Sequence, residues 1–251
     1  MKISDSYTIP GSCGDCATHS DNSFCHLPEP ALDRLKQIKS TYDYPRGKTL
    51  FMEGQPANSV FLLCSGRVKL STCSEEGKAV ILRIAVPGEI LGLPANISEK
   101  PHEATAQVLE DCRVGVVERQ EFMTFIETYP AAAHNALLQL SNNYLHTHEQ
   151  VCALGLSSSA GDKLIRLLLQ WCDGSAGGPV RISTVHTHGD MAEMIGTSRE
   201  TVTRLIKDLK GRGLIELSRI ELCIPDRGRL KAALGTHHRN GNGNGNGNGG
   251  M

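Results

Sequence analysis

The sequence lacks any apolar run close to the roughly 20 residues that a membrane-spanning helix needs. Its first residues, MKISDSYTIPGS, also lack the charged-then-apolar pattern of a secretory signal peptide. We therefore expect a cytoplasmic protein with no membrane partner. We find no Ser-His-Asp pattern, no glycine-rich phosphate loop and no HExxH zinc motif in the sequence, so we do not expect an enzyme.

The chain also lacks a strong net charge, since 26 Lys and Arg stand against 27 Asp and Glu in 251 residues. This excludes a generally basic coat for nucleic acid. The charge is uneven, however: residues 157–235 carry twelve Lys and Arg against nine Asp and Glu, and residues 1–156 carry thirteen against eighteen. A mildly basic C-terminal part behind an acidic N-terminal part fits a DNA reader joined to a separate module. The length is sufficient for two modest domains.

The stretch 187–212, THGDMAEMIGTSRETVTRLIKDLKGR, predicts two short helices joined by a glycine turn. Thr187 can cap the first helix, with Asp190 three residues further on, and Ser198 can cap the second. Gly196 ends the first helix. In the second helix, apolar residues recur at helical spacing, which predicts one buried face: Val202, Leu205, Ile206 and Leu209.

The opposite face of that second helix carries polar and charged residues: Arg199, Glu200, Thr203, Arg204 and Lys207. Arg can donate two hydrogen bonds to guanine, Glu can accept one from cytosine, and Thr can contact a thymine methyl group. Arg and Lys also bind phosphates. The arrangement is typical of a helix-turn-helix unit whose second helix enters the major groove, and a solvated charged helix face is the alternative.

From about Thr41 to Arg119, short apolar segments alternate with glycines, as in antiparallel strands joined by turns. Residues 74–78 read as a hairpin turn. The pattern predicts an antiparallel β-roll or jelly-roll-like barrel, preceded by a short amphipathic helix. After Gly213, LIELS and IELCI predict a two-stranded wing with Arg219 at its tip. The expected fold class is therefore α+β.

Glu118 to Ala153 reads as helix, with a break at Tyr129–Pro130. Beyond the break, residues recur at steps of three and four in a coiled-coil-like stripe. These residues are Leu137, Leu140, Tyr144, His148 and Val151. The alternative is a helix that packs only on its own barrel.

Two parts of the chain resemble one family. GTSRETVTRLIKDLKGRGLI resembles the recognition segment of the Crp/Fnr family of bacterial transcription regulators, and YPRGKTLFMEGQPANSVFLLCSGRVKL with PGEILG resembles its effector domain. The resemblance implies a homodimer that binds a palindromic operator in double-stranded DNA and acts on RNA polymerase. It makes the striped helix the dimer seam, Arg199, Glu200 and Arg204 the base readers, and Thr203 a modulator.

The resemblance and the composition together divide the chain into five parts. These are a cysteine-containing segment (1–28), a β-roll sensor domain (29–130), a dimerisation helix (131–156), a winged helix-turn-helix domain (157–235) and a disordered Asn/Gly tail (236–251). The recognition helix is expected over 198–210.

The resemblance also bears on the signal. Members of the family that bind cyclic nucleotide use a Glu for the ribose and an Arg-Ser pair for the phosphate. Leu93 stands at the position of that Glu, and Glu103–Ala104 at the position of Arg-Ser. Because a carboxylate repels a cyclic phosphate, cyclic AMP is not the expected ligand. The stretch ATAQVLED is closer to the Fnr branch, which implies a redox, oxygen or similar signal.

Nine cysteines in a reducing compartment do not indicate a disulfide framework. Cys13, Cys16 and Cys25 have the spacing C-x2-C-x8-C, and Fnr-type sensors hold a [4Fe–4S] cluster with three such cysteines and a fourth from the β-roll. Cys112 is the candidate fourth ligand, although it lies about three positions earlier than in that pattern. Zinc, a thiol switch and no cofactor are the alternatives. A metal or thiol redox protein, or a small-ligand module with secondary DNA binding, is the alternative function.

Overall fold

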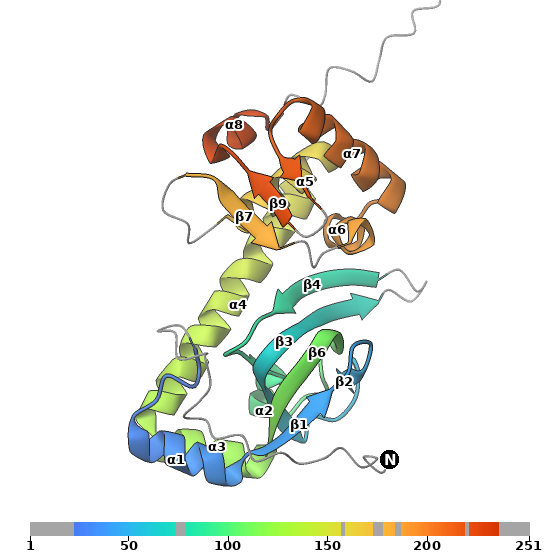
Figure 1. Ribbon diagram of the computed structural model, residues 1–251. Coiled ribbons are helices and arrows are strands. Elements are labelled where there is room, and N and C mark those ends of the chain that lie inside the picture. The colour runs from blue at the N-terminus through green and yellow to red at the C-terminus, as the bar shows by residue number, and fades with distance from the viewer. Residues whose placement is uncertain are drawn as a thin grey trace, which may run out of the picture. The chain divides into compact units, whose positions relative to one another are not determined.

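The computed structural model describes residues 23–73, 79–156, 159–172, 178–183, 187–218 and 221–235. The chain forms two compact units, Met1–His148 and Glu149–Met251 (Figure 1). The expected positions of Cys13 and Cys16, of Arg219 and of the 236–251 tail all lie outside the described residues.

The first unit is built on a six-stranded antiparallel sheet, which confirms the predicted β-roll (Figure 1). The strand order is β1-β6-β3-β4, and β2 pairs with β6 and β5 with β3. The strands are β1 (Ser40–Tyr44), β2 (Thr49–Phe51), β3 (Ser59–Cys73), β4 (Ala79–Ala85), β5 (Ile90–Leu91) and β6 (Thr105–Glu118). β3 and β4 pair antiparallel from Cys73↔Ala79 onward, and the hairpin turn predicted at residues 74–78 lies outside the described residues.

Alternation along the strands divides the core of this unit in two. One hydrophobic cluster lies among the strands and includes Phe51, Val68 and Val114. The other lies where the helices cover the sheet and includes Leu35, Phe122 and Leu93. β3 contributes to both clusters, Leu62 to the second and Leu63 to the first, because successive residues of a strand point to opposite faces.

Four helices belong to this unit or begin in it: α1 (Glu29–Ile38), α2 (Leu93–Ser98), α3 (Arg119–Thr128) and α4 (Pro130–Leu156). α1 contacts α3, and α3 contacts β3 and β6 (Figure 1). α3 ends at Tyr129, which is extended, and Pro130 begins α4, so the predicted break is confirmed. The short α2 is not predicted from the sequence. Its N-cap residue is Gly92, whose φ of 75° suits a residue without a Cβ.

Among the described residues, the second unit contains the end of α4, four further helices and a small sheet. The helices are α5 (Ala160–Gln170), α6 (His188–Ile195), α7 (Arg199–Gly211) and α8 (Arg227–Ala232). The strands are β7 (Val180–Ser183), β8 (Glu216–Leu217) and β9 (Glu221–Ile224), in the order β7-β9-β8. The two predicted wing strands are present as β8 and β9, whereas β7 and α8 are not predicted. α5 contacts α6, α7 and α8, so it is the base on which the other helices rest.

Within the described ranges, no helix combines the length and the apolar character that crossing a membrane requires.

Candidate nucleic-acid interface

The first helix of the predicted pair, α6, is fixed at both ends by its own sequence. The Thr187 N–H donates to the Asp190 carboxylate at 2.8 Å, and the Asp190 N–H donates to the Thr187 hydroxyl at 3.1 Å. This reciprocal capping box satisfies two N–H groups that the helix leaves unpaired. At the other end Gly196 is left-handed, with φ 65°, and stops the helix.

The second helix, α7, begins at Arg199, and Ser198 is its N-cap. The Ser198 hydroxyl accepts from the Thr201 N–H at 3.2 Å, as predicted for an N-cap. Val202, Ile206 and Leu209 are buried, and Leu205 is half-buried. The apolar face predicted from the spacing therefore anchors α7 to its unit.

The opposite face of α7 is open to solvent. Five exposed side chains line one surface hollow of about 370 Å³: Arg199, Glu200, Thr203, Arg204 and Lys207. These are the five residues that the sequence assigned to the major groove. The folded chain therefore gathers three cations, one carboxylate and one hydroxyl on a single exposed helix face, beside the exposed cap Ser198.

The Glu200 carboxylate is held in its charged form. Its own backbone N–H and the Ser198 hydroxyl both donate to it, and these hydrogen bonds lower the pKa of Glu200 from its usual value. A carboxylate fixed in this way accepts hydrogen bonds and donates none. It therefore suits an exposed base amine such as that of cytosine.

One residue of this surface is not predicted from the sequence. His188, the first residue of α6, places its Nδ1 2.9 Å from the Thr203 hydroxyl oxygen. The two residues are fifteen positions apart and lie on different helices. Their pairing depends on how α6 and α7 cross, which a periodicity argument does not supply.

The effector region of the first unit holds Leu93, Glu103 and Ala104, the residues that the sequence places at the nucleotide-binding positions. Leu93 is fully buried in the hydrophobic cluster beneath the helices, and Ala104 is buried as well. Glu103 is exposed. Beside them the His102 ring is buried and stacks on Phe51, with ring centroids 3.9 Å apart, and burial lowers the pKa of His102.

The described cysteines do not form a metal site. Cys112 is buried, and its Sγ donates to the carbonyl oxygens of Glu110 at 3.1 Å and Arg67 at 3.4 Å. Burial raises the pKa of this thiol to about 11, whereas a metal ligand must be a thiolate. Cys25 packs against the other hydrophobic cluster. Among the described residues, no three His, Cys, Asp or Glu side chains are grouped to hold a metal ion.

Cys112 therefore does not fit the role of fourth cluster ligand in this conformation. A thiolate there would lose the carbonyl acceptors and stand among apolar side chains. In a sequence, a cysteine on a buried strand and a cluster ligand look alike, because the pattern does not show their surroundings.

The predicted seam on α4 is apolar and mostly exposed. Leu137, Tyr144 and Val151 recur every seven residues and are 65%, 69% and 63% exposed. Leu138 and Leu145 are exposed beside them. His148 is exposed, and its ring lies 6.3 Å from that of Tyr144. Leu140 differs from the others, since it packs partly against the hydrophobic cluster of its own unit.

Comparison with known proteins agrees with both units. The family model for the cyclic nucleotide-binding domain matches residues 42–129, and that for the Crp-like helix-turn-helix domain matches residues 162–233. A CRP-like cAMP-activated global transcriptional regulator of Mycobacterium tuberculosis is 27% identical over 202 residues, which is 80% of this chain and 90% of that protein. The Electron transport regulator A of Shewanella oneidensis is 25% identical over 227 residues, which is 89% of this chain and 90% of that protein.

Solved structures show the same fold. A CooA variant from Carboxydothermus hydrogenoformans superimposes with a TM-score of 0.69 at 23% identity, covering 85% of this chain and 96% of the other. The two matched domains, in this order, define a DNA-binding transcription regulator with a cyclic-nucleotide-type sensor fold. The chain belongs to the Crp/Fnr family.

Proposed function

We propose that the protein works as a homodimer that reads a palindromic operator with α7, and that its signal is not cyclic AMP. The observation that carries the proposal is the exposed face of α7, where five residues suited to base and phosphate contacts line one hollow. Arg199, Glu200 and Arg204 are the base readers, and Lys207 holds phosphate. In a two-fold dimer the two copies of α7 reach half-sites about one helical turn of DNA apart.

The dimer is proposed to form along α4. A seven-residue repeat of large apolar side chains is the pattern by which two helices pair in a coiled coil. Leu137, Tyr144 and Val151 follow that repeat and are exposed. We propose that α4 of a second copy of the chain covers this stripe, because that helix carries the same apolar stripe. We propose RNA polymerase as a further partner, because a regulator bound at an operator acts on that enzyme. We also propose that the protein works in the cytoplasm.

The proposal on the signal is supported by the effector region. The ribose-binding carboxylate is replaced by Leu93, which is part of the core, and the phosphate-binding pair by Glu103 and Ala104. We propose a redox, oxygen or similar signal in its place. Titration with cyclic AMP is expected to release no binding heat and to leave DNA affinity unchanged. Micromolar binding would contradict this part of the proposal.

Iron content and the absorption spectrum of anaerobically purified protein test the nature of the signal. A brown, iron-loaded sample that bleaches in air would support a cluster on the N-terminal cysteines, with a ligand other than Cys112 completing it. Colourless protein that still binds its operator would rule out an obligatory cluster.

Selection from random 40-base-pair duplexes, using the full chain, tests the reading of DNA. The recovered duplexes are expected to share an inverted repeat. Arg199→Ala should reduce discrimination at one base position by about 1–3 kcal/mol. Arg229→Ala, an exposed arginine of α8 that does not line the hollow, is the matched control. An unchanged preference in Arg199→Ala would remove the base-reading role of α7.

A further inference from the structure

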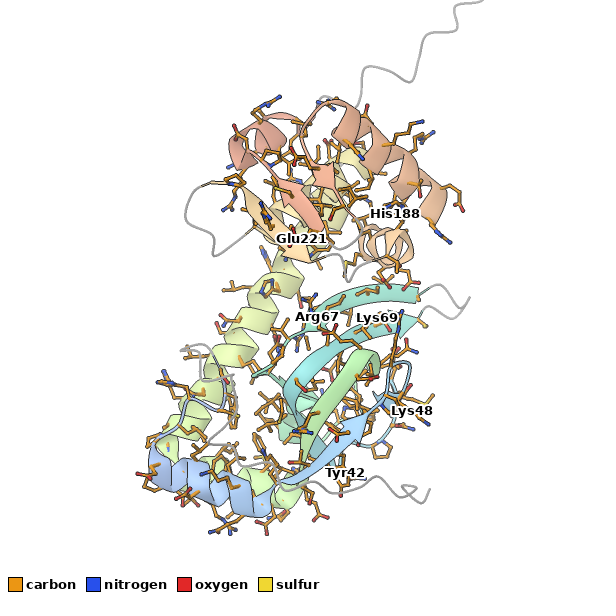
Figure 2. All side chains as sticks on the ribbon, viewed as in Figure 1. Tyr42, Lys48, Arg67, Lys69, His188 and Glu221 are labelled. Atoms are coloured by element: carbon orange, nitrogen blue, oxygen red, sulfur yellow. The ribbon has the colours of Figure 1, made fainter. Side chains whose placement is uncertain are left out.

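The contact between His188 and Thr203 determines what Thr203 can offer to DNA. His188 lies on α6 (Figure 2), and its Nδ1 is 2.9 Å from the Thr203 Oγ1 of α7. The Thr203 hydroxyl also lies 2.9 Å from the Arg199 backbone carbonyl, one turn earlier in α7. The hydroxyl thus has two partners before any DNA is present.

Counting hydrogens assigns the donor in each contact. A threonine hydroxyl carries one hydrogen and can accept on two lone pairs. The Arg199 carbonyl can only accept, so the hydroxyl hydrogen is directed to it. When the hydroxyl donates to Arg199, the contact with His188 is a hydrogen bond only if the ring donates from Nδ1 to Thr203. That N–H is present both in the protonated ring and in one neutral tautomer, and Thr203 selects that tautomer.

We propose that His188 is a positioning residue that makes Thr203 an acceptor-only contact for a DNA base. The proposal rests on the proposed function, because it concerns the same face of α7. With its hydrogen committed to Arg199 and one lone pair to His188, the Thr203 hydroxyl presents a single lone pair and its methyl group. Without His188, the bond to Arg199 alone leaves the hydroxyl free to turn and donate to DNA instead.

An acceptor-only hydroxyl distinguishes bases in the major groove. Adenine N6 and cytosine N4 are donors there, whereas guanine O6 and N7 and thymine O4 are acceptors. The base that faces Thr203 should therefore be adenine or cytosine. A free threonine hydroxyl would accept either kind of base, so His188 adds selectivity without touching the base itself.

The test uses the duplex selected by the wild-type chain and a panel in which each operator position carries all four bases. Thr203→Val, which keeps the shape and loses the hydroxyl, identifies the base position that depends on Thr203. At that position the wild type is expected to prefer adenine or cytosine by about fivefold, the typical value of one hydrogen bond. His188→Gln removes the donor at Nδ1, and His188→Asn keeps an amide N–H in its place.

His188→Gln should reduce the preference at that position to less than about twofold and leave the other positions unchanged. His188→Asn should keep the wild-type profile. In the double variant with Thr203→Val, His188→Gln should have no further effect, because the hydroxyl that it positions is absent. Melting curves equal to that of the wild type would show that each variant is folded.

Three results would overturn the proposal: a wild-type preference for guanine or thymine at this position, an unchanged profile in His188→Gln, or an equal loss in His188→Asn. Each leaves the proposed function intact if Arg199→Ala still loses discrimination. A chain that selects no common sequence at all would instead remove the proposed function.

Discussion

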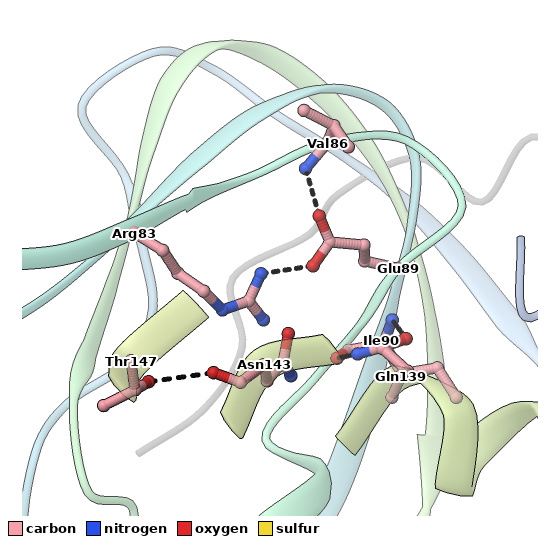
Figure 3. A network of polar contacts seen from close by, with 7 residues as sticks. All are labelled: Arg83, Val86, Glu89, Ile90, Gln139, Asn143 and Thr147. Atoms are coloured by element: carbon pink, nitrogen blue, oxygen red, sulfur yellow. Dashed lines mark hydrogen bonds and ion pairs between the residues drawn. The ribbon is translucent and has the colours of Figure 1, made fainter. Parts of the chain in front are cut away.

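Gln139 of α4 binds both backbone groups of Ile90 in β5 (Figure 3). Its side-chain oxygen accepts from the Ile90 N–H at 2.8 Å, and its side-chain nitrogen donates to the Ile90 carbonyl at 2.6 Å. The residue before Ile90 is also tied down, since the Glu89 carboxylate pairs with Arg83 and accepts from the Val86 N–H. The Gln139 side chain therefore holds α4 against β5, because it bonds to the backbone N–H and C=O of Ile90 as a neighbouring strand would.

Replacing Gln139 with Ala should destabilise the first unit. Two hydrogen bonds would be lost and two backbone groups of a short strand would lose their partner, for a cost of about 1–3 kcal/mol in the free energy of unfolding. Urea unfolding followed by circular dichroism measures it. Gln120→Ala is the control, because Gln120 is an exposed glutamine of α3. Equal stability of the two variants would show that the Ile90 contacts contribute nothing.

Charges on the exposed face of α4 should separate the proposed dimer. Tyr144→Glu with Leu137→Glu places two carboxylates in a seam of large apolar side chains, and like charges from the partner copy would face them. Analytical ultracentrifugation is expected to show a monomer with much weaker operator binding. Asn142→Glu is the control, because two residues along a helix turn the side chain about 200° away from Tyr144. A dimer that survives the double substitution would place the interface elsewhere.

Removing the side chain of Lys207 should change how DNA affinity depends on salt concentration. Lys207→Ala removes one phosphate contact, so binding should weaken for all duplexes alike, and the slope of log K against log salt should fall by about 0.9. Lys231→Ala, on exposed α8, should leave the slope as it is. Filter binding at four salt concentrations measures both. A base-specific loss in Lys207→Ala would instead make it a reader.

The buried thiol of Cys112 should resist alkylation. Its pKa of about 11 keeps it protonated at pH 8, and it is shielded from solvent, whereas Cys73 is exposed. Iodoacetamide at pH 8, followed by peptide mass spectrometry, should label Cys73 in the native protein and Cys112 only after unfolding. Native labelling of Cys112 at the rate of Cys73 would show that the strand opens readily and would restore it as a candidate ligand.

The first unit should lose stability in mild acid because of His102. Burial lowers the pKa of this histidine below the ordinary 6.5, and the nearby Glu103 opposes the shift only in part. The unfolded chain therefore binds a proton more readily than the folded one, and the stabilising contribution is full above pH 6.5 and declines as the pH falls below it.

The dependence of stability on pH should become flatter in His102→Gln. His134→Gln, at an exposed position of α4, is the matched control. Thermal melts between pH 5 and pH 8 measure the difference. The same slope in wild type and His102→Gln would assign the acid sensitivity to other groups.

What the sequence predicted well depends on local interactions. The caps of α6 and α7 connect residues three apart, so the sequence pattern predicts the capping roles of Thr187, Asp190 and Ser198. The exposed polar face of α7 followed from helical spacing, and the break at Pro130 follows from proline chemistry. These elements are fixed by neighbours in the chain, and the structure confirms them.

What the sequence did not predict depends on distant neighbours or very short elements. α2 and α8 have six residues each and β7 has four, which is too short for a period to register. Leu140 and Leu137 belong to one apolar stripe, yet only the position of the sheet decides that Leu140 packs inward. The pairing of His188 with Thr203 and the burial of Cys112 also require the folded chain.

The capping box of α6 and the serine cap of α7 have one more consequence. Both helices finish their own ends with groups from within the unit, so the reading head is preorganised in the free protein. If this face of α7 reads DNA as proposed, the complex forms with little loss of conformational freedom. The two capped helices would then not rearrange around a mismatched base, and the full cost of the mismatch would appear in the measured affinity.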